Sequence, residues 1–154
     1  MTAVGRIVLP GDGRILRPLP NSMTVKLDED ETRPDGFALI EYQTAPGLPP
    51  NPPHLHRTFE EAWYILEGEV EFRFAGRREL ARPGTFVFAP RGVPHAFTVM
   101  GDTPARWLTL FSPGRYFRMV EELLAALPPG GGPPPAARWT EILERYDSEV
   151  VPDL

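Results

Sequence analysis

Short runs in which apolar and polar residues alternate fill much of the chain before residue 112, and they predict β-strands. The clearest is the segment VEFRF, where Val70, Phe72 and Phe74 fall on one face and charged residues on the other. A glycine at position 76 then predicts a tight turn, so residues 70–81 are expected to form a hairpin. Other apolar runs bounded by Gly or Pro predict strands at residues 23–27, 37–42, 62–66, 85–89, 95–99 and 106–111. Strands at this spacing favour an antiparallel sandwich or a small barrel.

The period of the pattern changes to that of a helix near the C-terminus. In residues 116–127 the apolar side chains recur at helical spacing. Residues 138–146 repeat this pattern, with an apolar stripe made of Trp139, Ile142, Leu143 and Tyr146. The intervening segment PPGGGPPPAA separates the two helices. We therefore expect an all-β core followed by helices that serve as packing or dimer elements rather than as a catalytic lid.

A chain of 154 residues is expected to form one domain that buries roughly 68–70% of its unfolded surface. We expect residues 1–36 to form an N-terminal arm with edge strands, residues 37–112 the barrel core and residues 113–154 the helical extension. The first 20 residues could instead pack on a neighbouring subunit. The acidic segment from Asp28 is expected to be a solvated loop, and the Pro-rich stretch 48–53 a stiff extended one.

The composition excludes several classes of function. The formal net charge is −5 and no basic face is visible, so we expect no nucleic-acid partner. The chain contains no cysteine, which excludes disulfides, thiolate metal ligands and a cysteine nucleophile. No apolar run has the length of a signal peptide or a membrane span, so we expect a cytoplasmic protein without membrane association.

The chain has three histidines, and their placement indicates a metal site. His54 and His56 are two residues apart on a segment expected to be extended, so their side chains share a face. His95 follows a turn rich in Gly and Pro before another predicted strand. Three imidazoles and a nearby carboxylate form a ligand set for one metal ion, with positions left open for Lewis-acid or O₂ chemistry.

Two adjacent carboxylates compete for the fourth position in this set, Glu60 and Glu61. On a strand of period two, Glu61 shares a face with Trp63 and Ile65, which should point into the core. Glu60 would then face outward or lie at the rim. Parity therefore favours Glu61 as the ligand.

These residues fall into two motifs that resemble those of the cupin family. The first motif contains Gly, His-x-His, Glu and Gly, and its counterparts here are Gly47, His54, His56, Glu61 and Gly68. The second contains Gly, Pro-x-Gly and His, and its counterparts are Gly84, Pro90, Gly92 and His95. The chain departs from the family pattern at two places. The gap of six residues between Gly47 and His54 is one residue longer than usual, and Val99 replaces an Asn that is not a metal ligand.

The resemblance implies a double-stranded β-helix, the cupin jelly-roll barrel, with one divalent transition metal per chain. The implied ligands are His54, His56, Glu61 and His95, and the gap of six residues between Glu61 and Gly68 supports Glu61 over its neighbour. Imidazole and carboxylate ligands suit Fe, Ni, Mn, Cu or Zn and do not choose among them. The habit of the family, together with the N-terminal arm, implies a homodimer.

The tail segment ERYDSEVV resembles the helical extension of small quercetinase-like bacterial cupins. This resemblance implies a mononuclear-metal dioxygenase that acts on a small aromatic or enolisable substrate. Glu61 would then be catalytic, both as a metal ligand and as a proton acceptor. Two alternatives use the same barrel: a non-oxidative metal-dependent isomerase, decarboxylase or lyase, and a cupin that binds a small molecule without turnover.

Overall fold

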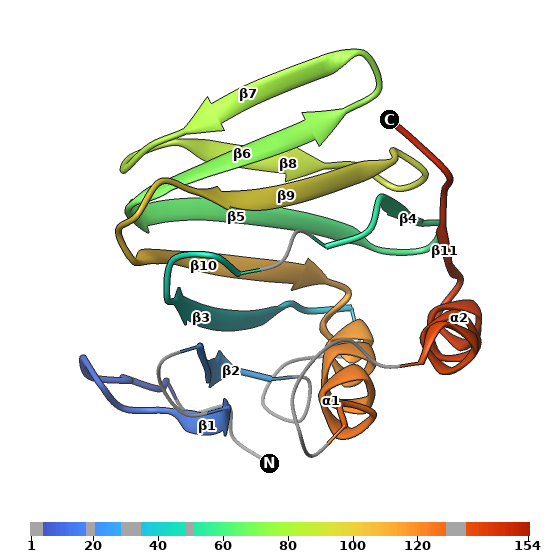
Figure 1. Ribbon diagram of the computed structural model, residues 1–154. Coiled ribbons are helices and arrows are strands. Elements are labelled where there is room, and N and C mark those ends of the chain that lie inside the picture. The colour runs from blue at the N-terminus through green and yellow to red at the C-terminus, as the bar shows by residue number, and fades with distance from the viewer. Residues whose placement is uncertain (1–4, 18–20, 29–34, 49–50, 129–134) are drawn as a thin grey trace.

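Two antiparallel β-sheets face each other in the computed structural model, and two helices stand at one end of them (Figure 1). The structure describes residues 5–17, 21–28, 35–48, 51–128 and 135–154. Parts of the acidic loop, of the Pro-rich stretch before His54 and of the PPGGGPPPAA segment lie outside these residues.

The larger sheet has six strands, and all of its neighbouring strands are antiparallel. In spatial order they are β1 (Arg14–Arg17), β2 (Ser22–Leu27), β3 (Ala38–Thr44), β10 (Ala105–Ser112), β5 (Glu60–Glu67) and β8 (Phe86–Ala89). The smaller sheet has five strands, also antiparallel. These are β11 (Ser148–Val150), β4 (His54–His56), β9 (His95–Met100), β6 (Glu69–Phe74) and β7 (Arg77–Ala81).

Side chains that alternate along the strands fill the space between the sheets. On β10, every second residue is buried, from Ala105 to Phe111. The largest side chains under the middle of the sheets are aromatic, namely Trp63, Phe72 and Trp107, each of which is at most 2% exposed. The alternation of β6 is confirmed, because Val70 and Phe72 are buried and the charged Glu69, Glu71 and Arg73 are not.

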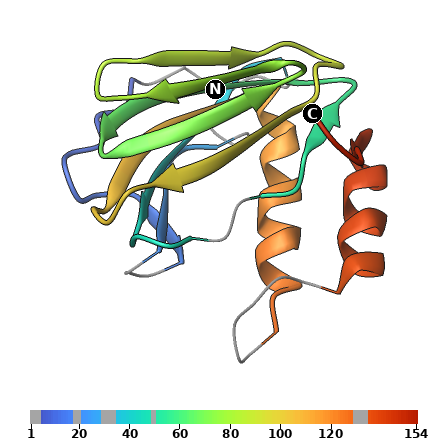
Figure 2. The same ribbon diagram turned by 45° about the horizontal axis from the view of Figure 1, so that its top comes forward.

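The helices cover one end of the barrel. A short 3₁₀ helix, η2 (Gly114–Tyr116), leads into α1 (Phe117–Ala125), and α2 (Ala136–Arg145) stands beside α1 (Figure 2). The helices pack on the core through side chains that are at most 1% exposed, namely Phe117, Ile142 and Leu143. These helices have 9 and 10 residues, and no helix among the described residues is long and apolar enough to cross a membrane.

The predicted strands and both helices are confirmed, with ends that shift by at most two residues. The strand β11 was not predicted, because the end of the chain carries no alternating pattern beyond three residues. The apolar runs of the sequence predict that most aromatic residues of these strands belong to the core, namely Trp63, Tyr64, Phe72, Phe74, Phe86, Phe88 and Phe97. This prediction is wrong for Tyr64, Phe86 and Phe88, which are 43%, 64% and 47% exposed. These three residues lie on the outward face of the six-stranded sheet. Successive side chains of a strand alternate between faces, so Tyr64 points away from the face of the buried Trp63, and its partner Phe86 on β8 shares its face. The homodimer stays a prediction.

Gly68 joins the two sheets at the turn between β5 and β6, and it has two reasons to be glycine. Its φ is +74°, and a Cβ there would lie 2.6 Å from the Pro104 carbonyl oxygen and 2.7 Å from Ala105 Cα. Gly76, between β6 and β7, has a φ of +69° but nothing within 4 Å of such a Cβ. The first glycine is therefore required by conformation and by space, and the second by conformation alone.

We expect Gly76→Ala to lower the free energy of unfolding by about 1–2 kcal/mol through its left-handed backbone. Gly68→Ala should lower it by about 1–3 kcal/mol more, because the added methyl also collides with backbone atoms. Urea unfolding of both variants measures the difference. Equal losses would show that the close approach at Gly68 does not constrain the barrel.

Candidate metal centre

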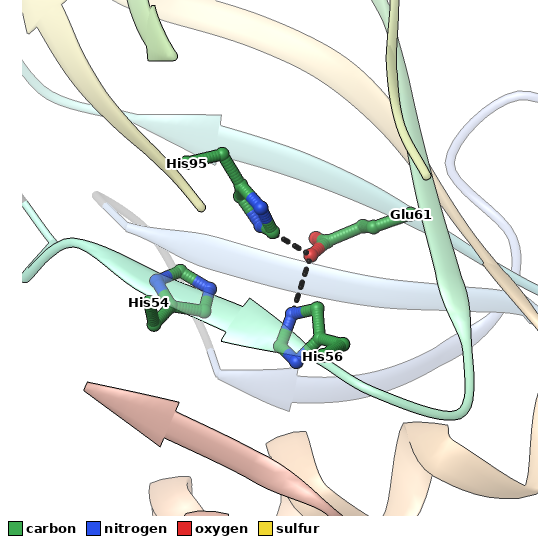
Figure 3. Close-up of side chains that lie close together, drawn as sticks. All are labelled: His54, His56, Glu61 and His95. Atoms are coloured by element: carbon green, nitrogen blue, oxygen red, sulfur yellow. Dashed lines mark hydrogen bonds and ion pairs between the residues drawn. The ribbon is translucent and has the colours of Figure 1, made fainter. Parts of the chain in front are cut away.

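The two histidines of β4 and the histidine of β9 lie together because their strands are neighbours. His54 and His95 are paired across β4 and β9. The ring centroids of His54 and His95 are 4.5 Å apart, and those of His56 and His95 are 5.2 Å apart. The period of two within β4 places His56 on the same side as His54, so all three rings face the barrel interior (Figure 3).

Glu61 reaches the same point from the opposite sheet. Its Oε2 atom lies 3.2 Å from Nε2 of His56 and 3.5 Å from Nε2 of His95 (Figure 3). One potential ligand atom from each of His54, His56, Glu61 and His95 can be chosen so that all lie within 4.8 Å of one another. Side chains from two sheets thus converge on one small space, and all four residues named from the sequence are brought together.

Glu60 does not join this cluster. It lies on the other face of β5, where its carboxylate is 3.7 Å from Nε of Arg91 in an exposed ion pair. Glu61, by contrast, is only 7% exposed. The parity argument that separated the two carboxylates is confirmed.

Hydrogen bonds on the outer side of two rings determine their tautomers. Nδ1 of His54 lies 2.8 Å from the Pro52 carbonyl oxygen, and Nδ1 of His95 lies 2.9 Å from that of Val93. A carbonyl oxygen can only accept, so we assign the proton of each neutral ring to Nδ1. The Nε2 atoms are left with a lone pair that faces the interior. In each case the carbonyl belongs to the residue two positions earlier in the chain.

His56 is held in the same tautomer by a side chain. Its Nδ1 lies 2.8 Å from Oγ of Ser148, and that hydroxyl donates to the Tyr146 carbonyl oxygen at 3.1 Å. Because the hydroxyl proton is used on Tyr146, the Ser148 oxygen accepts from His56. In this tautomer Nε2 of His56 presents a lone pair to a metal, whereas in the other tautomer it donates a hydrogen bond to Oε2 of Glu61 at 3.2 Å.

The charges of the cluster suit a cation. Burial, followed by the two neighbouring imidazoles, lowers the pKa of His54 to about 3, and burial also lowers the pKa of His56. Burial raises the pKa of Glu61, but His56 and His95 outweigh this effect and bring it down to about 2. The lowered pKa values of His54 and His56 favour their neutral forms, and neutral imidazole and ionised carboxylate are the forms that bind a metal.

The Nε2 atom of His95, unpaired among the described residues, indicates that a metal fits this space. Nε2 of His95 has no hydrogen-bond partner within the part of the chain that the structure describes, although the residue is 1% exposed. Oε2 of Glu61, 3.5 Å away, is an acceptor like itself. A buried acceptor without a donor is costly, and a cation placed among the four side chains would satisfy all of them at once.

The wall around the cluster is aromatic. Trp63 and Phe74 approach His95 with ring centroids at 5.4 and 6.4 Å, and Phe59 stacks on His56 at 4.0 Å. Tyr42 stacks on Trp107 at 5.4 Å, and burial, together with the charge of Glu61, raises the pKa of its hydroxyl. The hydroxyl of Tyr42 therefore stays protonated and can donate a hydrogen bond.

Sequence reasoning placed Tyr42 and Phe59 in or beside strands but assigned neither to the site, and it did not consider Ser148. For Tyr42, the alternation of β3 was the available signal, because Tyr42 has the parity of the buried Ala38 and Ile40. No local pattern identified Ser148, whose contact with His56 joins residues 92 positions apart.

Comparison with known proteins gives a consistent picture. Residues 41–111 match the family model described as a cupin domain. No curated protein matches the chain. Among solved structures it is similar to the polyketide cyclase RemF from Streptomyces resistomycificus, with a TM-score of 0.58 and 25% identity over 77% of this chain and 96% of that one.

Two further structures are similar in fold. KdgF from Halomonas sp. has a TM-score of 0.59 and 18% identity over 71% of this chain and 94% of that one. The DMSP lyase DddQ from Ruegeria pomeroyi DSS-3 has a TM-score of 0.50 and 31% identity over 60% of this chain and 46% of that one. Taken with the two facing antiparallel sheets, these matches show that residues 41–111 are similar to a cupin domain and that the chain has the double-stranded β-helix fold.

Proposed function

We propose that this chain is a metal-dependent cupin enzyme that acts on a small aromatic or enolisable molecule. The observation that carries the proposal is the buried convergence of three imidazoles and one carboxylate, whose potential ligand atoms lie within 4.8 Å of one another. His54, His56 and His95 would hold one divalent transition metal through Nε2, and Glu61 through its carboxylate. Fe, Ni, Mn, Cu and Zn all suit these ligands.

When bound, such an ion supplies Lewis acidity that lowers the pKa of a coordinated substrate oxygen, and a redox-active ion also supports reaction with O₂. The chain itself supplies a base. Glu61 is ionised, and its carboxylate has two oxygen atoms, so one can serve as ligand while the other accepts a proton from the substrate.

The aromatic wall supports the choice of substrate class. Trp63 and Phe74 lie next to His95, and both present apolar faces or edges that would pack against a flat substrate and exclude water. The protonated hydroxyl of Tyr42 would donate a hydrogen bond to a substrate oxygen. These side chains would bind and orient an aromatic or enolisable molecule beside Glu61.

For the reaction, we propose dioxygenation of that substrate first, on the basis of the resemblance to small quercetinase-like cupins. The second candidate is a non-oxidative reaction such as cyclisation, isomerisation, decarboxylation or elimination. It is favoured by the likeness to the cyclase RemF, at 25% identity, and to the lyase DddQ, at 31% identity. Removal of a proton by Glu61 is common to both candidates.

The proposed metal ligands can be tested by measuring the metal content of the purified protein. We expect the full chain, purified without a metal-chelating tag, to contain about one transition metal ion per chain by elemental analysis. Loss of a ligand's hydrogen-bond partner typically weakens metal affinity by about 10–100-fold. His95→Ala removes a ligand itself and should weaken metal affinity further. Glu60→Gln is the matched control and should retain the metal, because its side chain faces away from the cluster. Wild-type protein that binds no added Fe²⁺, Co²⁺, Ni²⁺ or Zn²⁺ would contradict the proposal.

The reaction class can be tested by the dependence on O₂. Metal-loaded protein is incubated with flavonols and enolisable ketones in air and under anaerobic conditions, and products are identified by mass spectrometry. Turnover that stops without O₂ and adds two oxygen atoms to the product supports dioxygenation, whereas undiminished anaerobic turnover eliminates it and supports the second candidate. Glu61→Gln should lower kcat by about 10²–10⁴-fold, as expected for loss of a general base. Tight binding without product from any substrate would instead indicate a binding module.

A further inference from the structure

The C-terminal segment lies directly against the strand that carries two of the proposed ligands. β11 pairs with β4 in antiparallel register, so that Ser148 is opposite His56 and Val150 is opposite His54 (Figure 1). Two backbone hydrogen bonds extend this pairing, from Arg57 N to the Asp147 carbonyl oxygen at 2.8 Å and from Val151 N to that of Pro53 at 2.9 Å. The tail is therefore part of the sheet that forms the site.

Ser148 is the point at which this segment touches a proposed ligand. The residue is 3% exposed, and its hydroxyl accepts from Nδ1 of His56 at 2.8 Å while donating to the Tyr146 carbonyl oxygen at 3.1 Å. The corresponding nitrogens of His54 and His95 are held by carbonyl oxygens from their own loops. His56 alone among the three histidines relies on a distant part of the chain for its tautomer and ring orientation.

The face of the His56 ring also packs against Phe59, which in turn packs against the C-terminal extension. Phe59 stacks on His56 at 4.0 Å with an interplanar angle of 23°, and Tyr116 of η2 stacks on the other face of Phe59 at 4.4 Å and 18°. The Thr58 hydroxyl bridges the two parts of the extension, lying 2.7 Å from the Tyr116 hydroxyl and 3.1 Å from the Asp147 carboxylate. The hydrogen bond to Ser148 thus holds the edge of the His56 ring, and the stack of Phe59 and Tyr116 supports its face.

The helices keep Ser148 in place. Tyr146, at the end of α2, donates its hydroxyl to Glu122 of α1 at 2.6 Å, and Arg145 pairs with the same carboxylate. Asp147 then turns the chain into β11 with a φ of +52°, a conformation that few residues other than glycine adopt. Such a bend persists where the surrounding structure holds it, as the bonds of Asp147 to Thr58 and Arg57 do here.

We propose that the C-terminal extension is a built-in part of the metal centre, in which Ser148 is a positioning residue that orients His56 and couples docking of the tail to metal binding. This inference rests on the proposed metal site. Coupling between two events is reciprocal, so the tail must favour metal binding and the metal must favour docking of the tail by the same factor.

Three variants of the full chain test the first half of this coupling, with Co²⁺ as the probe. Ser148→Ala removes the acceptor for Nδ1 of His56, and Ser148→Thr keeps it. Glu149→Ala is the matched control, because it removes the ion pair to Arg57 from the same strand without touching a proposed ligand. Circular dichroism verifies that each variant is folded.

We expect Ser148→Ala to bind Co²⁺ about 10–100-fold more weakly and to change the visible absorption of the bound ion, since loss of a ligand's hydrogen-bond partner typically has this effect. Ser148→Thr and Glu149→Ala should bind within about threefold of wild type with its spectrum. An unchanged affinity and spectrum in Ser148→Ala would overturn the inference. So would an equal loss in Glu149→Ala, which would assign the effect to general packing of the tail.

Hydrogen exchange of the wild-type chain tests the reverse direction without any substitution. Co²⁺ should slow exchange at the amides of Arg57 and Val151, which join the tail to β4 and its flanks, and leave the amides of β7 unchanged. No slowing upon Co²⁺ binding overturns the coupling and leaves the metal site intact. A wild-type chain that binds no metal at all overturns the proposed function as well, so the two failures are distinguishable.

Discussion

In the tautomers that the outer hydrogen bonds favour, three imidazole lone pairs and one carboxylate are held against one another inside a barrel, and such an arrangement is unfavourable without a cation. Nε2 of His95 has no donor within the described residues, and Nε2 of His56 faces a carboxylate oxygen at 3.2 Å. Water would normally satisfy such acceptors, but three of the four residues are at most 7% exposed. The fold therefore holds a cluster of electron donors whose natural complement is a metal ion.

The double-stranded β-helix can impose this arrangement because each ligand is fixed by structure on its outer side. Two ligands come from β4, one from β9 and one from β5 in the facing sheet, and pairing of β4 with β9 sets the distance between His54 and His95. Each Nδ1 is engaged by an oxygen, so no ring can rotate without losing a hydrogen bond. Preorganisation of this kind serves binding and catalysis alike, since little has to move when a metal or substrate arrives.

The sequence was sufficient for the parts of the site that follow from local rules. A period of two separated Glu61 from Glu60 and placed His54 beside His56, while glycine and proline marked the turns that bring His95 to the same end of the barrel. The contact of Ser148 with His56 could not be predicted, because it depends on how the helices return the chain to β4. The exposure of Tyr64, Phe86 and Phe88 shows a different limit. An aromatic side chain alone does not indicate burial, whereas parity with Trp63 places Tyr64 on the outer face, and strand pairing places Phe86 there with it.

The most direct measurement of the central claim is X-ray absorption spectroscopy of the full chain loaded with Zn²⁺. The account predicts about three imidazole nitrogens and one or two oxygens at about 2.0–2.2 Å, with the multiple scattering that imidazole rings produce. Replacement of His95 by alanine should remove one imidazole from that count. A wild-type spectrum with fewer than three imidazoles, or one unchanged by the replacement, would contradict the claim that these four side chains form the metal centre.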